Sequence, residues 1–163
     1  MDALEFAKSI EKEGKEYYLK LAKDSPEPSL AGVFNFLAKE EQRHYDIFDA
    51  LQKKTPVRTE PGTASAEAKK MFAGLSSHFA LPEMFYDYTA AYMRALEMEK
   101  KSVDLYDGML SKASSTDEKR ILSFLVLEEQ KHEHLMEHMI EFVNKPNVFL
   151  ETSEFNHLDD EEV

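Results

Sequence analysis

The sequence predicts an all-α protein, a four-helix bundle built from two duplicated helical hairpins joined by a long crossover. Only 5 Gly and 6 Pro occur among 163 residues, of which 42% are hydrophobic and 32% charged, as in long amphipathic helices. Apolar residues recur at spacings of three and four through four long segments. Two closely similar segments, 36–44 and 124–132, start 88 residues apart at positions 36 and 124. This repeat indicates duplication.

The first hairpin is predicted from two long periodic segments and the prolines between them. We expect a helix over residues 2–24, because Ser25-Pro26-Glu27-Pro28 follows and its two prolines block continuation of the helix. A second helix is expected over residues 29–54. It ends before residues 55–62, which are rich in turn-forming residues.

The crossover and the second hairpin follow. We expect the crossover over about residues 55–81, with a weak helix at 66–79 inside it. The third helix is expected over 82–112, because Pro82 suits the first turn of a helix. Residues 114–117 supply caps for the fourth helix.

The chain is expected to form one domain and a tail. Its length suits a single domain with a substantial core. The fourth helix is predicted to reach Asn144, before Pro146. We therefore place the bundle at residues 1–145 and an acidic C-terminal tail at residues 146–163.

Each predicted helix carries one glutamate on its apolar stripe. These four residues are Glu11, Glu41, Glu99 and Glu129. Glu41 and Glu129 each open a Glu-x-x-His motif, with His44 and His132 three residues later. Residues three apart on a helix differ by about 60° in direction and about 4.5 Å in rise, so each pair can serve one ligand region. Glu40 and Glu128 point about 100° away and are expected to be less central.

This set of side chains predicts a site for two metal ions. Four ionised carboxylates buried together would cost several kcal/mol each before their mutual repulsion. Two divalent cations would balance them, with both imidazoles neutral. Oxygen and imidazole ligands without sulfur suit iron or manganese, and zinc also accepts them. One Glu from each of two helices and Glu-x-x-His from each of the other two is the pattern of di-iron and di-manganese bundles.

Other candidate residues have alternative interpretations. Tyr18 and Tyr106, each seven residues after a candidate ligand, are either core tyrosines or donors to the ligand carboxylates. His134 and His138, four residues apart, are either solvated or a surface metal site. A third Glu-x-x-His at residues 154–157 lies outside the repeat, and we interpret it as coincidence.

Charge and composition exclude several classes of function. A net charge of −12 argues against binding nucleic acid or anionic membrane surfaces. The absence of cysteine excludes disulfides, iron–sulfur clusters and cysteine-based zinc sites. No apolar run approaches the roughly 20 residues of a membrane span, and the acidic N-terminus is unlike a signal peptide. We expect a cytoplasmic protein.

The motifs resemble a known family. Segments 10–18 and 40–44, with their counterparts at 99–106 and 128–132, are similar to the erythrin domain of rubrerythrins, in the ferritin-like superfamily. The resemblance covers about residues 1–145 and implies a ferritin-like bundle holding two iron ions. It implies the following roles: Glu41 and Glu129 bridge the metals, Glu11 and Glu99 cap one metal each, and His44 and His132 supply one nitrogen each.

The resemblance also implies an activity. Such proteins react their reduced metal pair with hydrogen peroxide or dioxygen, and rubrerythrins typically reduce peroxide to water. The implied protein is an oxidoreductase of the peroxidase or ferroxidase type, acting in oxidative stress as a homodimer. Two alternatives remain at this point: an iron-binding, storage or delivery protein that uses the same site without catalysis, and a metal-free structural bundle.

The chain departs from typical rubrerythrins in two respects. They carry a further carboxylate one turn after the third-helix ligand, where this chain has Ser102, mirrored by Gly14 in the first half. The expected six-ligand site is therefore symmetric. Typical members also append a rubredoxin domain with four iron-binding cysteines, and this chain has no cysteine. Electrons are therefore expected from a separate partner, such as a rubredoxin-like protein.

Overall fold

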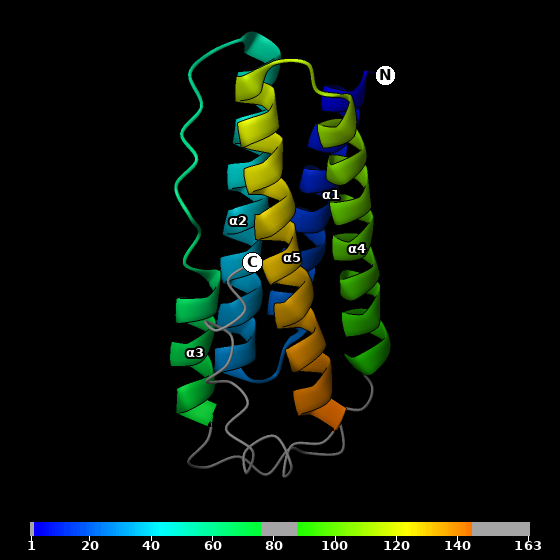
Figure 1. The fold of residues 1–163 in the computed structure, drawn as a ribbon. Helices are drawn as coiled ribbons and strands as arrows, with labels where there is room; N and C mark the ends of the chain where they lie inside the picture. Colours follow the sequence, from blue (N-terminus) through cyan, green and yellow to red (C-terminus); the bar gives the residue numbers. More distant parts are fainter. Residues whose placement is uncertain (1, 76–87, 145–163) are drawn as a thin grey trace.

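A computed structural model describes residues 2–75 and 88–144 and has five α-helices within these ranges. They are α1 (Ala3–Asp24), α2 (Pro28–Lys53), α3 (Ala64–Leu75), α4 (Thr89–Lys112) and α5 (Thr116–Asn144). The four long helices α1, α2, α4 and α5 form a bundle, and the short α3 lies in the crossover beside α2 (Figure 1). The predicted all-α fold class is confirmed. None of the helices in the described ranges is long and apolar enough to cross a membrane.

The long helices pack as two hairpins, α1 with α2 and α4 with α5. Local chemistry sets their ends. The Asp2 side chain accepts a hydrogen bond from the first turn of α1, and Glu27 does the same for α2, whose first helical residue is Pro28. At the other end of α2, Lys54 adopts a left-handed conformation with φ of 55° and stops the helix.

Most predicted helix ends lie within one or two residues of the observed ones. The predicted crossover helix at 66–79 corresponds to α3, which begins two residues earlier, at Ala64. Four parts of the predictions lie outside the described residues: the end of that helix after residue 75, the start of the third helix at Pro82, the tail at 146–163 and the motif at 154–157.

Two apolar clusters fill the bundle and leave a polar layer between them. One cluster includes Leu37 and the other includes Phe48, both fully buried on α2. Between them on the same helix lie the buried residues Glu41 and His44. The same order, with buried polar residues between members of the two clusters, holds on α1, α4 and α5. Polar side chains from all four long helices therefore meet in the middle of the bundle.

Residues 55–63 connect α2 to α3 and are called the strap below. Figure 1 shows this segment running back from the end of α2 toward α3 alongside the bundle. Hydrogen bonds attach it to both hairpins: Arg43 Nη1 of α2 donates to the carbonyl oxygen of Glu60 at 2.7 Å, and Arg120 Nη1 of α5 donates to Thr59 Oγ1 at 2.6 Å. The strap therefore links α2 and α5, which belong to different hairpins.

Two leucines on α5 test the core. Leu125 is fully buried, while Leu127 is 41% exposed. Replacing Leu125 with alanine should lower the free energy of unfolding by about 2–5 kcal/mol, because the substitution removes buried methyl groups and leaves a cavity. Leu127→Ala should change it by about 0.5 kcal/mol or less. Urea unfolding of both variants measures the difference, and equal losses would contradict this packing.

Candidate metal centre

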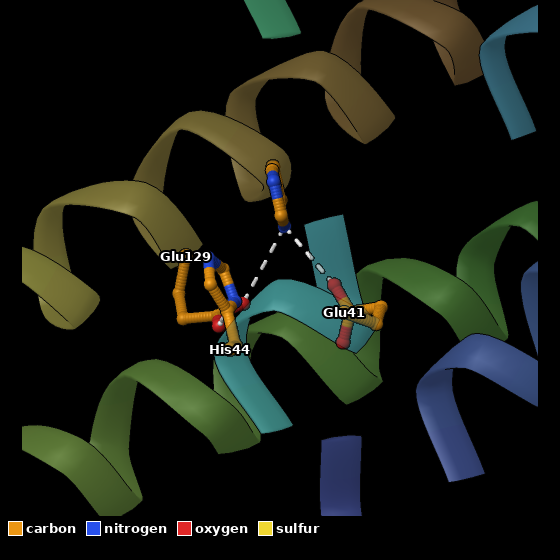
Figure 2. A group of neighbouring side chains, drawn as sticks. Glu41, His44 and Glu129 are labelled. Atoms are coloured by element: carbon orange, nitrogen blue, oxygen red, sulfur yellow. Dashed lines mark ion pairs between the residues drawn. The ribbon is translucent and has the colours of Figure 1, made fainter. Parts of the chain in front are cut away.

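The structure brings the six predicted ligand residues together in the polar layer. Each has at most 3% of its surface exposed: Glu11, Glu41, His44, Glu99, Glu129 and His132. Figure 2 shows Glu41, His44 and Glu129 pointing toward one another from α2 and α5. One ligand atom from each of Glu41, His44, Glu129 and His132 lies within 4.8 Å of the others. Helix periodicity and the repeat predicted that the six residues lie together.

The site has two similar halves that share Glu129. In one half, His44 Nδ1 lies 2.6 Å from Glu129 Oε1 and 3.7 Å from Glu11 Oε2. In the other half, His132 Nδ1 lies 3.2 Å from Glu41 Oε1, 3.6 Å from Glu129 Oε2 and 3.9 Å from Glu99 Oε2. The two imidazole rings are stacked, with centroids 5.3 Å apart. Each imidazole therefore directs Nδ1 toward carboxylates from other helices.

Many of these close atoms lack hydrogen bonds, which supports a metal site. Both nitrogens of each histidine, both oxygens of Glu129, Glu11 Oε2 and Glu41 Oε1 are buried without a hydrogen-bond partner among the described residues. They are near one another, but their directions do not fit hydrogen bonds, even at 2.6 Å. Leaving so many polar atoms unpaired is costly. Carboxylate oxygens and imidazole nitrogens that converge in this way fit a divalent metal pair.

Two tyrosines hold the outer glutamates across the bundle. The Tyr18 hydroxyl on α1 donates to Glu99 Oε1 on α4, and the Tyr106 hydroxyl on α4 donates to Glu11 Oε1 on α1. Both tyrosines are buried. Of the two interpretations that the sequence allowed, the structure therefore supports donors to the carboxylates. Each hydrogen bond leaves Oε2 of its glutamate facing the centre.

Charge crowding changes the proton affinities in the metal-free protein. Burial, followed by repulsion from Glu41 and Glu129, raises the pKa values of Glu11 and Glu99 well above the usual 4.5. Burial opposes the shift at Glu129, but the nearby histidines lower its pKa. Burial likewise opposes the shift at His132, but the nearby carboxylates of Glu129 and Glu41 raise its pKa. The layer therefore favours cationic partners for its carboxylates.

Small residues line the site three residues after the glutamates of α1 and α4. A Cβ atom on Gly14 would lie 2.7 Å from Glu41 Oε2, so a larger residue at that position would make the Glu41 carboxylate shift. Ser102, its counterpart on α4, is buried at 4% exposure. Neither position adds a charge, and the set of four glutamates and two histidines is symmetric between the halves.

Glu40 and Glu128 are buried in the bundle, although the sequence predicted a less central position. Both are buried, at 8% and 3% exposure, although a helical projection places them away from the stripe. Arg43 donates to both carboxylates. Burial opposes ionisation of Glu128, yet Arg43 lowers its pKa below the usual range. The projection missed this pair because the strap, and not solvent, covers that face.

The other histidine candidates do not join the centre. The His134 side chain is 51% exposed and lies 3.6 Å from Glu137, and that of His138 is 25% exposed and lies 3.9 Å from Glu141. The Glu/His groups that could hold a metal, searched within residues 2–75 and 88–144, do not include them. His134 is solvated, as one of the two interpretations held, whereas His138 is partly buried.

Together, the fold and the polar layer define a class: four-helix proteins with a buried carboxylate–histidine group that fits a metal site. A family model described as Rubrerythrin matches residues 2–140, so this chain belongs to the rubrerythrin family. Comparisons with curated proteins and with solved structures give no match.

The raised pKa values predict how pH affects the metal-free protein. A group with a raised folded-state pKa stabilises the fold below its unfolded pKa, and that stability is lost as pH rises through the folded value. Glu11 and Glu99, from pH 4.5 upward, and His132, from 6.5 upward, should thus make the metal-free protein less stable as pH rises. Glu129, with a lowered pKa, acts in the opposite sense as pH falls below 4.5.

Chemical unfolding of chelator-treated protein between about pH 5 and about pH 8 measures this slope. The double variant E11Q/E99Q should reduce the slope, because neutral amides do not titrate, and the contribution of His132 above pH 6.5 should remain. The control E97Q changes an exposed glutamate of α4 and should keep the slope. Stability that rises with pH in the metal-free wild type would contradict the assignment.

Removing either tyrosine hydroxyl should weaken metal binding. We expect Tyr18→Phe and Tyr106→Phe each to reduce affinity for Co²⁺ by about 10–100-fold, because the outer glutamates lose the donors that orient them. Tyr92→Phe is the matched control, since the buried Tyr92 hydroxyl has no hydrogen-bond partner among the described residues. Calorimetric titration measures all three affinities, and equal values would exclude this orienting role.

Proposed function

We propose that this chain is a di-iron oxidoreductase that reacts with hydrogen peroxide or dioxygen, by rubrerythrin-like peroxide reduction or ferroxidase chemistry. One observation carries the proposal: buried carboxylate and imidazole atoms from α1, α2 and α5 converge without hydrogen-bond partners among the described residues. Membership of the rubrerythrin family supports iron as the metal. Manganese and zinc accept the same ligand types.

The six residues divide into bridging and capping roles in this proposal. Glu129 would bridge the two ions, since its two oxygens face the two histidines at 2.6 and 3.6 Å. Glu41, its counterpart in the repeat, would be the second bridge. Glu11 with His44, and Glu99 with His132, would each supply the remaining protein ligands of one ion. Two divalent ions then match the charge of four carboxylates.

The surrounding residues fix this geometry and limit access of water. Tyr18 and Tyr106 keep their protons, because burial and then the nearby glutamates raise their pKa values, so they remain hydrogen-bond donors. An apolar cluster closes the layer on each side along the bundle. Bound ferrous iron supplies the two electrons that convert one peroxide molecule and two protons to two water molecules.

Several further features belong to the proposal. The sequence has no cysteine to hold an electron-transfer cluster, so a separate donor such as a rubredoxin-like protein would reduce the centre. We also propose a cytoplasmic homodimer acting in oxidative stress, as the family resemblance implies.

Catalytic turnover is the test. Iron-loaded protein with an excess of a chemical reductant should consume many equivalents of peroxide per chain. The double variant E41A/E129A should lose at least about 100-fold in rate, because both bridges are removed. L127A, altered on the exposed face of α5, should keep the wild-type rate.

The alternatives give different results. Iron binding with a single stoichiometric oxidation and no turnover would instead favour a storage or delivery protein. Iron content unaffected by E41A/E129A would contradict the site and favour a metal-free structural bundle, which removal of buried charge would stabilise.

A further inference from the structure

A second buried carboxylate pair lies beside the six-residue centre, on the face that the strap covers. Glu40 of α2 and Glu128 of α5 each precede a candidate ligand by one residue and are equivalent positions in the repeat. One ring nitrogen of His44 and one oxygen from each of these glutamates lie within 4.8 Å of one another. Because both nitrogens of His44 are buried without hydrogen-bond partners among the described residues, the pair is next to the centre's own unpaired atoms.

Arg43 occupies the position between these two carboxylates. A single nitrogen, Nη2, donates to Oε2 of Glu40 at 2.6 Å and also to Oε2 of Glu128. A metal ion bound by the same two oxygens would require that position, so the guanidinium and a divalent cation exclude each other. The Arg43 side chain is 29% exposed, so part of it already reaches solvent.

The strap closes this position from outside. The Gly62 backbone N–H donates to Glu128 Oε2 at 2.9 Å, and Arg43 holds the strap through the Glu60 carbonyl. A Cβ atom on Gly62 would collide with Glu40 Oε2 and would lie 2.7 Å from Arg43 Nη2. The strap thus packs directly on the carboxylates and their arginine, and a larger residue at position 62 would make these side chains shift.

We propose that Glu40 and Glu128 form a transfer site through which divalent cations reach the metal centre, with Arg43 and the strap as its closed gate. The inference rests on the proposed function, because it presupposes a centre that takes up metal. A cation would displace Nη2 of Arg43, bind between the two Oε2 atoms, and pass to the ligands around His44. Arg43 would then return and donate again to both carboxylates.

Charge and composition favour this route. Two adjacent carboxylates attract a divalent cation and offer oxygen ligands along its path. The cavity of about 410 Å³ lined by Leu4, Leu51, Met109 and other mainly apolar residues gives a cation few ligands. The α2–α5 face instead has a carboxylate pair between the strap and the centre.

The rate at which metal-free protein binds Co²⁺ tests the route, followed by stopped-flow absorption. The double variant E40Q/E128Q should fill about tenfold more slowly, because it loses the attracting charges. The filled centre should still hold two ions. R43M should fill faster than the wild type, because the competing cation is absent. K131M is the matched control: Lys131 contacts the other oxygen of Glu128 at 3.3 Å from an exposed position, so its loss removes a positive charge without clearing the gate, and the rate should rise less than in R43M.

Two further measurements separate a failure of the transfer site from unfolding of the variant and from a failure of the proposed function. If E40Q/E128Q unfolds because Arg43 loses its partners, E40Q/E128Q/R43M removes all three charges and should also fill slowly. If E40Q/E128Q or E40Q/E128Q/R43M fills at the wild-type rate, the transfer site is overturned, and the proposed metal centre is not affected. A wild-type protein that binds no Co²⁺ would contradict the proposed function, and this inference with it.

Discussion

The structure depends on four carboxylates buried together in one layer of a helical bundle. Apolar clusters lie on both sides of this layer, so water cannot solvate the carboxylates. Burial and mutual repulsion together raise the pKa values of Glu11 and Glu99. A group of this kind is stable when cations or protons balance it. The two histidines and the unpaired oxygens fit a divalent metal in both charge and geometry.

This requirement explains features that lie far apart in the sequence. Each tyrosine hydroxyl reaches a glutamate of the other hairpin, so the same hydrogen bonds orient the ligands and tie the hairpins together. Gly14 lets α1 approach Glu41, and Gly62 lets the strap approach Glu128. The strap joins the hairpins on the α2–α5 face. The same contacts therefore hold the helices together and position the residues of the site.

The sequence alone predicted the helices and the six clustered residues, because both depend on local periodicity. Prolines and capping residues fixed most helix ends, and the repeat separated meaningful glutamates from abundant surface ones. Tertiary contacts could not be predicted from local periodicity. Which glutamate Tyr18 would contact depends on how α1 faces α4. The burial of Glu40 and Glu128 depends on the path of the strap, which a helical projection does not contain.

The most direct test of the account is a crystal structure of the iron-loaded protein with anomalous diffraction measured at the iron edge. The account predicts two iron peaks about 3.5–4 Å apart in the polar layer. One should lie against Glu11 and His44 and the other against Glu99 and His132, with Glu129 between them. A layer without iron, or a single iron bound elsewhere, would contradict the claim that these buried carboxylates form a two-metal site.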